Sequence, residues 1–129
     1  MTTKRYTFTK QERLSWKRHI DLLFAEGSSF VAFPLRVIFL FSEEPMPVRS
    51  SILISVPKKK FKRAVKRNRI KRLVRENYRL QKEPLIDSLT EKDKHLLVAF
   101  LFIDQEEPTF QSTDKAMSKA IRILREKIG

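Results

Sequence analysis

Apolar residues recur every three or four positions in three segments of the chain, which is the spacing of an amphipathic helix. The first helix is predicted over residues 9–26, with Thr9 and Glu12 in the spacing of a capping box. The second covers most of residues 57–82, and the third covers about residues 112–128. The apolar face of the first helix consists of Trp16, Ile20, Leu23 and Phe24, and core packing is the default expectation for Trp16 and Leu23.

Shorter apolar runs predict strands. Residues 30–41 are rich in Phe, Val, Ile and Leu, and Pro34 indicates that regular pairing begins after it. Residues 48–56 form a second predicted strand, and the turn at 42–47 between them predicts a hairpin. Residues 96–103, LLVAFLFI, are continuously apolar, which is typical of a strand buried on both faces.

The order of these elements is helix, strand, strand, helix, strand, helix. It predicts an α+β fold, a two-layer sandwich of a mixed, mainly antiparallel sheet of about four strands with about three helices. The middle helix and the strands on either side of it form a βαβ unit. Residues 84–94 are expected to be a polar connection with at most a short helical turn. With 129 residues, the chain is expected to form one domain over 1–129, of which 1–9 is a mobile basic arm.

Positive charge is concentrated in one part of the chain. The formal net charge is +13, from 28 basic and 15 acidic residues. Residues 57–82 contain thirteen of the bases and a single acid, Glu76, so the remainder is nearly neutral. A field of this kind attracts polyanions to one element.

On a helical wheel, the bases of this segment lie on one side. Ile70, Leu73, Val74 and Leu80 share an apolar arc that is predicted to pack on the sheet. A solvated helix face usually mixes the signs of its charges, so this pattern favours binding of nucleic acid. The cationic stripe consists of Arg67, Asn68, Lys71, Arg72, Arg75, Arg79 and Lys82.

Candidates for catalysis by the chain itself are weak. The chain contains no cysteine, and His19 and His95 have no neighbours at metal-ligand spacing. The carboxylates lie mainly in turns, and Glu76 is expected to pair with a neighbouring arginine. We therefore expect no catalytic residue and no metal site in the protein. The chain also lacks a signal-peptide pattern and a membrane-spanning run, so a cytoplasmic protein is expected.

The segment AVKRNRIKRLVRENYR, residues 64–79, resembles the protein subunit of bacterial ribonuclease P. That family carries an Arg-Asn-Arg run on a helix, then Lys-Arg, then Arg-Glu one turn later. The segment ISVPKKKFKRAV, residues 54–65, is similar to the end of the family's strand before the basic helix, and the region before Gly27 is also similar to the family. The chain departs from the family at Ile20, where an aromatic residue is common, and at Pro57, where serine is common. The glycine that usually precedes the basic helix is absent.

The resemblance implies a division of labour. The RNA subunit of this ribonucleoprotein endoribonuclease carries the Mg²⁺ ions and cleaves precursor tRNA at its 5′ end. The protein binds no cofactor itself, and its partners are the catalytic RNA and the 5′ leader of precursor tRNA, with no membrane and no protein partner implied. Contact with the catalytic RNA is expected at Lys58, Lys59, Arg63, Arg67, Asn68, Arg69, Lys71, Arg72, Arg75 and Arg79. The candidates for the leader cleft are Arg13, Lys17, Ile20, Phe24, Arg36 and Phe39.

Two alternatives remain open at this point. The charge and the mixed sheet also suit a structural RNA-binding protein of the kind found in ribosomes. An autonomous nuclease would need carboxylates that converge beside the basic surface, because two-metal cleavage depends on them.

Overall fold

The computed structural model describes residues 10–42 and 44–129. Its centre is a four-stranded sheet with the order β1-β2-β4-β3. Strands β1 and β2 pair antiparallel, as do β2 and β4, whereas β3 and β4 run parallel. The predicted α+β class with a mixed, mainly antiparallel sheet is therefore confirmed. The strands are β1 (Ser28–Ala32), β2 (Leu35–Ser42), β3 (Ser50–Ser55) and β4 (His95–Phe102).

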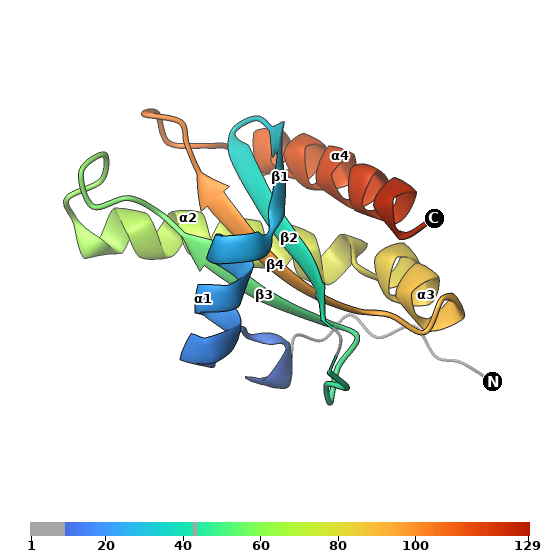
Figure 1. The fold of residues 1–129 in the computed structure, drawn as a ribbon. Coiled ribbons are helices and arrows are strands. Elements are labelled where there is room, and N and C mark those ends of the chain that lie inside the picture. Colours follow the sequence, from blue (N-terminus) through green and yellow to red (C-terminus); the bar gives the residue numbers. More distant parts are fainter. Residues whose placement is uncertain (1–9, 43) are drawn as a thin grey trace.

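Three helices cover one face of the sheet, and a fourth lies on the other face. Figure 1 shows α1 in front of the sheet and α2 behind it. The main core joins the inner face of the sheet to α2, α3 and α4, and it includes Phe39, Phe100, Val74, Leu89 and Leu124. A second, smaller cluster joins α1 to the opposite face through Leu23, Leu97 and Ala99. The helices are α1 (Lys17–Glu26), α2 (Ala64–Gln81), α3 (Glu83–Glu91) and α4 (Phe110–Ile128).

The predicted hairpin between residues 30–41 and 48–56 is wrong. β4 lies between β2 and β3, because its side chains are the most apolar and are buried on both faces, which only a central strand provides. The hairpin forms instead within the first apolar run, where Phe33 and Pro34 connect β1 to β2 and Ala32 is paired with Leu35. The parallel pair of β3 and β4 around α2 confirms the predicted βαβ unit.

The N-terminal helix is shorter than predicted. A 3₁₀ turn, Lys10–Glu12, comes first, and the chain then becomes extended until α1 starts at Lys17. The extended part lies against the edge strand, where the Leu14 amide donates to the Ile52 carbonyl oxygen at 2.7 Å. This bond explains the late start of the helix, because β3 offers its free edge to the backbone. Thr9, and with it the predicted capping box and basic arm, lies outside the described residues.

Residues 83–91 form α3, although a polar connection was expected there. Leu85 and Leu89 are fully buried on its inner side. Pro84 stands in its first turn, a position that tolerates the missing amide hydrogen. The same proline therefore marks the end of α2 and the start of a second helix.

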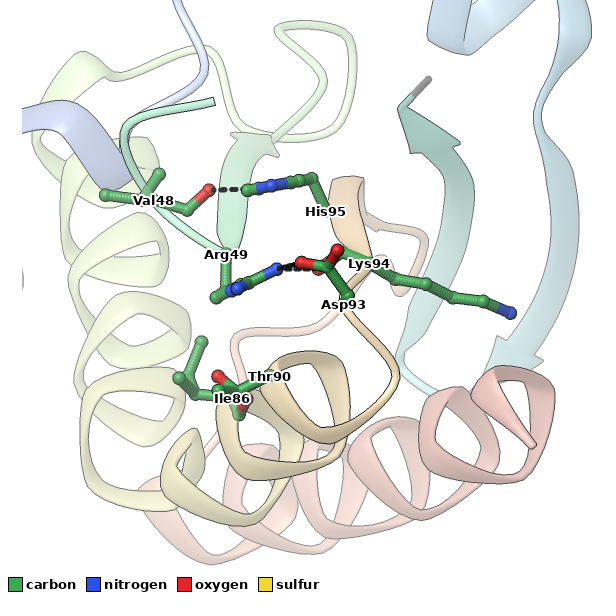
Figure 2. Close-up of polar contacts among 7 residues, drawn as sticks. All are labelled: Val48, Arg49, Ile86, Thr90, Asp93, Lys94 and His95. Atoms are coloured by element: carbon green, nitrogen blue, oxygen red, sulfur yellow. Dashed lines mark hydrogen bonds and ion pairs between the residues drawn. The ribbon is translucent and has the colours of Figure 1, made fainter. Parts of the chain in front are cut away.

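Polar contacts hold the connection between β2 and β3 against the start of β4. Figure 2 shows the Arg49 guanidinium pointing at the Asp93 carboxylate, 3.0 Å away. The Val48 carbonyl oxygen accepts a hydrogen bond from Nδ1 of His95 at 3.0 Å (Figure 2). These contacts hold the end of this connection against the start of β4.

Candidate nucleic-acid interface

Helix α2 places its cationic face on the surface of the protein. Ile70, Val74 and Tyr78 are buried on its inner side and anchor it to the sheet. Leu80, which was predicted to pack in the core, is 41% exposed, and Leu73 is only half-buried, because Asn77 and Tyr78 occupy the buried side of the last turns. None of the ten predicted contact residues is buried. Six are exposed, namely Lys58, Lys59, Arg63, Asn68, Arg69 and Arg72, and four are half-buried, namely Arg67, Lys71, Arg75 and Arg79.

Arg67 stabilises the loop that leads into the helix. Its Nη1 donates to the carbonyl oxygens of Phe61 and Lys62, at 2.7 and 2.8 Å. Phe61 itself is buried against Phe102, so a packing contact and the hydrogen bonds from Arg67 hold the same part of the loop. The family glycine that the sequence lacks before this helix is thus replaced by a turn that an arginine side chain holds in place.

Three cations from distant parts of the sequence meet beside the free edge of β3. Arg13, Lys71 and Arg75 line a pocket of about 200 Å³, together with Leu14 and residues 52–54 of β3. Partial burial, followed by the positive charges of Arg13 and Arg72, lowers the pKa of Arg75. Cations that lie close together and repel each other form a site for an anion such as phosphate.

The last turn of α2 contains a local ion pair. Arg79 donates through Nε to the Glu76 carboxylate at 3.1 Å, and its second nitrogen also contacts that carboxylate. The hydrogen bond from Arg79 lowers the pKa of Glu76, and the same bond raises the pKa of Arg79. The expected pairing of Glu76 with an arginine is confirmed. Arg79 therefore brings less net charge to the surface than its neighbours do.

Lys82 is not part of the cationic stripe. Its Nζ lies 2.6 Å from Oε2 of Glu12, and both side chains are buried. This pair ties the N-terminal segment to the end of α2, and Arg13 follows Glu12 directly. The position of Arg13 beside Arg75 is thus supported by a buried contact that the sequence pattern did not indicate.

The six candidates for a leader cleft do not all meet on one face. Phe39 points into the main core and is 7% exposed, so the prediction that it stacks on bases is wrong. It belongs to the inner face of the sheet because it alternates with Ile38 and Leu40, which pack toward α1. Arg36 shares the phase of Ile38 and is exposed, and Phe24 on α1 is 47% exposed.

The other three candidates have different surroundings. Ile20 is half-buried against the cluster beneath α1, and Lys17 is exposed at the start of that helix. Arg13 lies with the cations of α2. Trp16, which was assigned to the core, is 68% exposed, because the chain before α1 follows the edge of β3. The sequence pattern did not indicate that Trp16 lies on the surface, because its exposure depends on the extended backbone before α1.

The described part of the chain contains no group of three or more His, Cys, Asp or Glu residues that could hold a metal ion. No helix among the described residues is both long and apolar enough to cross a membrane.

Comparison with known proteins identifies the family. A sequence model described as Ribonuclease P matches residues 8–125. The ribonuclease P protein component of Porphyromonas gingivalis is 45% identical over 116 residues, which cover 90% of this chain and 85% of that protein. The chain belongs to the ribonuclease P family. The corresponding protein of Chlorobium phaeobacteroides is 31% identical over 126 residues, covering 90% of this chain and 86% of its own length.

Solved ribonuclease P proteins share the fold. The protein of Staphylococcus aureus superposes with a TM-score of 0.67 at 23% identity and covers 88% of this chain and 95% of its own. That of Thermotoga maritima gives a TM-score of 0.67 at 23% identity, covering 86% of this chain and 96% of its own. The chain is a protein component of the ribonucleoprotein endoribonuclease that matures tRNA, as the resemblance implied. Membership of this family disfavours the ribosomal and autonomous-nuclease alternatives.

Proposed function

We propose that the cationic face of α2 binds the catalytic RNA of ribonuclease P. The observation that carries this proposal is that Arg13, Lys71 and Arg75 line one pocket beside the free edge of β3. None of the ion pairs among the described residues involves these three cations. Their repulsion is relieved when a phosphate binds, and release of counterions from the RNA adds to the affinity.

The face of the sheet that carries α1 is proposed to bind the 5′ leader of precursor tRNA. Phe24 offers an exposed ring for stacking on an unpaired base, and Arg36 and Lys17 offer cations for its phosphates. Ile20 packs against the small apolar cluster between α1 and the sheet and so helps to hold α1 in place. Phe39 plays no part in this surface, since it stabilises the core.

Cleavage is proposed to belong to the RNA subunit, which also holds the Mg²⁺ ions. The protein then acts by binding and orienting two RNAs, and by neutralising phosphates that would otherwise repel each other. Such a partnership operates where precursor tRNA is made, so we expect the protein in the cytoplasm.

The test is reconstitution of cleavage. Precursor tRNA is incubated with the protein, with the cognate catalytic RNA, and with both, at physiological salt and Mg²⁺. We expect 5′ cleavage to be fastest with both components, and no cleavage by the protein alone. Cleavage by the RNA-free protein, or no stimulation when the protein is added, would overturn the proposal.

A further inference from the structure

Trp16 is the single tryptophan of the chain, and it lies on the surface with 68% of its area exposed. Its indole stacks on the imidazole of His19, with ring centroids 5.2 Å apart and planes inclined by 28°. The stack holds one face of the indole against α1. A large aromatic ring that is held in place yet exposed is typical of a binding surface.

A pocket opens beside this ring. It has a volume of about 340 Å³ and lies between the N-terminal segment and the 44–48 loop. Its apolar walls include Met46, Pro45 and Pro47, together with Trp16 itself, and Ser51 lines it as well. This volume falls within the roughly 300–1,000 Å³ of pockets that hold small organic groups.

The charges around the pocket favour an anionic occupant. Lys10 and Arg13 line it, and Lys17 follows Trp16 directly. The lining contains one described acid, Glu44, and that carboxylate is engaged by Arg18. An aromatic plane with apolar walls and cations beside it matches a nucleotide, which has a flat base and a charged phosphate.

We propose that this pocket binds an unpaired base of single-stranded RNA, which stacks on the Trp16 indole while its phosphates contact Arg13 and Lys10. The proposal rests on the RNA-binding function proposed above and adds a base-binding site to it. This site is separate from the surface at Phe24 and Arg36, because those residues line no part of the pocket. Arg13 lines both this pocket and the pocket beside Lys71 and Arg75, so one strand can follow the cations from the pocket to α2.

The test uses the full chain and the fluorescence of its single tryptophan. An unstructured oligouridylate is compared with an abasic oligomer of the same length and charge. We expect the base-containing oligomer to quench Trp16 emission in a saturable way, and the abasic oligomer to quench it much less. In anisotropy titrations of labelled oligouridylate, Trp16→Ala is expected to lower the affinity about 5-fold or more, which is the lower end for loss of one stacked base.

Two variants sharpen the result. Trp16→Phe keeps a ring and is expected to retain most of the preference for the base-containing oligomer. Phe110→Ala removes an exposed ring beyond the carboxyl end of β4, away from the pocket, and is expected to leave the affinity unchanged. Equal quenching by the abasic oligomer, or an unaltered affinity of Trp16→Ala, would overturn the proposal.

The remaining outcomes are also decisive. If deletion of residues 1–9 alters Trp16 emission in the absence of RNA, while oligouridylate does not alter it, the chain itself fills the pocket and the proposal fails. If the catalytic RNA binds with a salt dependence that α2 variants reduce, but Trp16→Ala has no effect, only this inference fails. If the protein binds neither the catalytic RNA nor the oligomer, the proposed function fails with it.

Discussion

Glu12 and Lys82, seventy positions apart, form a buried ion pair with 2.6 Å between the carboxylate oxygen and Nζ. Their side chains are 9% and 6% exposed, so water screens the pair little. The pair joins the segment that carries Arg13 to the end of α2, which carries Arg75. It thereby holds together two cations whose repulsion would separate an unanchored segment from the helix.

Removal of one partner of this pair is expected to destabilise the protein strongly. Glu12→Ala leaves the Lys82 ammonium buried without its carboxylate, which costs about 3–5 kcal/mol of the free energy of unfolding. Urea unfolding measures the loss. The matched control is Glu126→Ala, which breaks the exposed pair with Arg122 and is expected to cost less than about 1 kcal/mol. Equal effects of the two substitutions would show that the buried pair has no special role.

The three cations beside β3 are expected to set the salt dependence of RNA binding. Alanine at Arg13, Lys71 or Arg75 removes one phosphate contact and is expected to reduce the slope of log affinity against log salt by about 0.7–0.9. Filter binding of the catalytic RNA between low and moderate salt measures the slope. Lys119→Ala removes an exposed cation of α4 and serves as the control. An unchanged slope in all three variants would exclude these residues from the interface.

Helix α2 could be predicted from the sequence because its signals are local. Seven bases between Lys66 and Arg79 and the spacing of Ile70 and Val74 define both its position and its outward face. The order of the strands could not be predicted in this way. β4 takes the centre through contacts with β2 and β3 that are distant in sequence, and a short turn after β2 is compatible with several pairings.

The errors at the site have the same origin. Trp16 fits the apolar face of a continuous helix, but the bond between Leu14 and Ile52 extends the backbone and turns the indole outward. Lys82 fits a cationic stripe, but Glu12 draws it into the interior. Phe39 lies in a strand whose two sides both carry apolar residues. Alternation alone therefore did not indicate which side faces the larger core.

Arg67 and Arg69 are expected to behave differently, although both stand in the same Arg-Asn-Arg run. Arg67→Ala removes two hydrogen bonds to the loop before α2 and is expected to cost about 1.5–3 kcal/mol of stability, besides weakening RNA binding. Arg69→Ala is expected to weaken RNA binding with little change in stability, because Arg69 is exposed. Thermal unfolding and RNA affinity are measured together. A loss of stability in both variants, or in neither, would contradict the role of Arg67 in stabilising the loop before α2.

Tyr78 is expected to make the protein sensitive to alkaline pH. Complete burial raises the pKa of its phenol, and the hydroxyl of Ser50 opposes this only in part. The folded protein therefore holds the phenolic proton more tightly than the unfolded chain, whose tyrosine titrates near pH 10. The resulting stability is fully present below about pH 10 and is lost progressively as the pH rises above that value. Tyr78→Phe is expected to flatten the decline of unfolding free energy at alkaline pH, and an undiminished decline would assign it to other groups.

Phe39 and Phe24 provide a direct comparison of core and surface roles. Phe39→Ala is expected to cost about 3–5 kcal/mol of stability, because it leaves a cavity among Phe30, Phe41 and the buried face of the sheet. Phe24→Ala is expected to alter stability little, since about half of the ring is already exposed, and to lower the affinity for leader-bearing precursor tRNA. Mature tRNA without a leader is the control ligand. Phe24→Ala is expected to bind it with the same affinity as the unmodified protein. If Phe24→Ala reduced both affinities equally, its ring would contact a part of the substrate other than the leader.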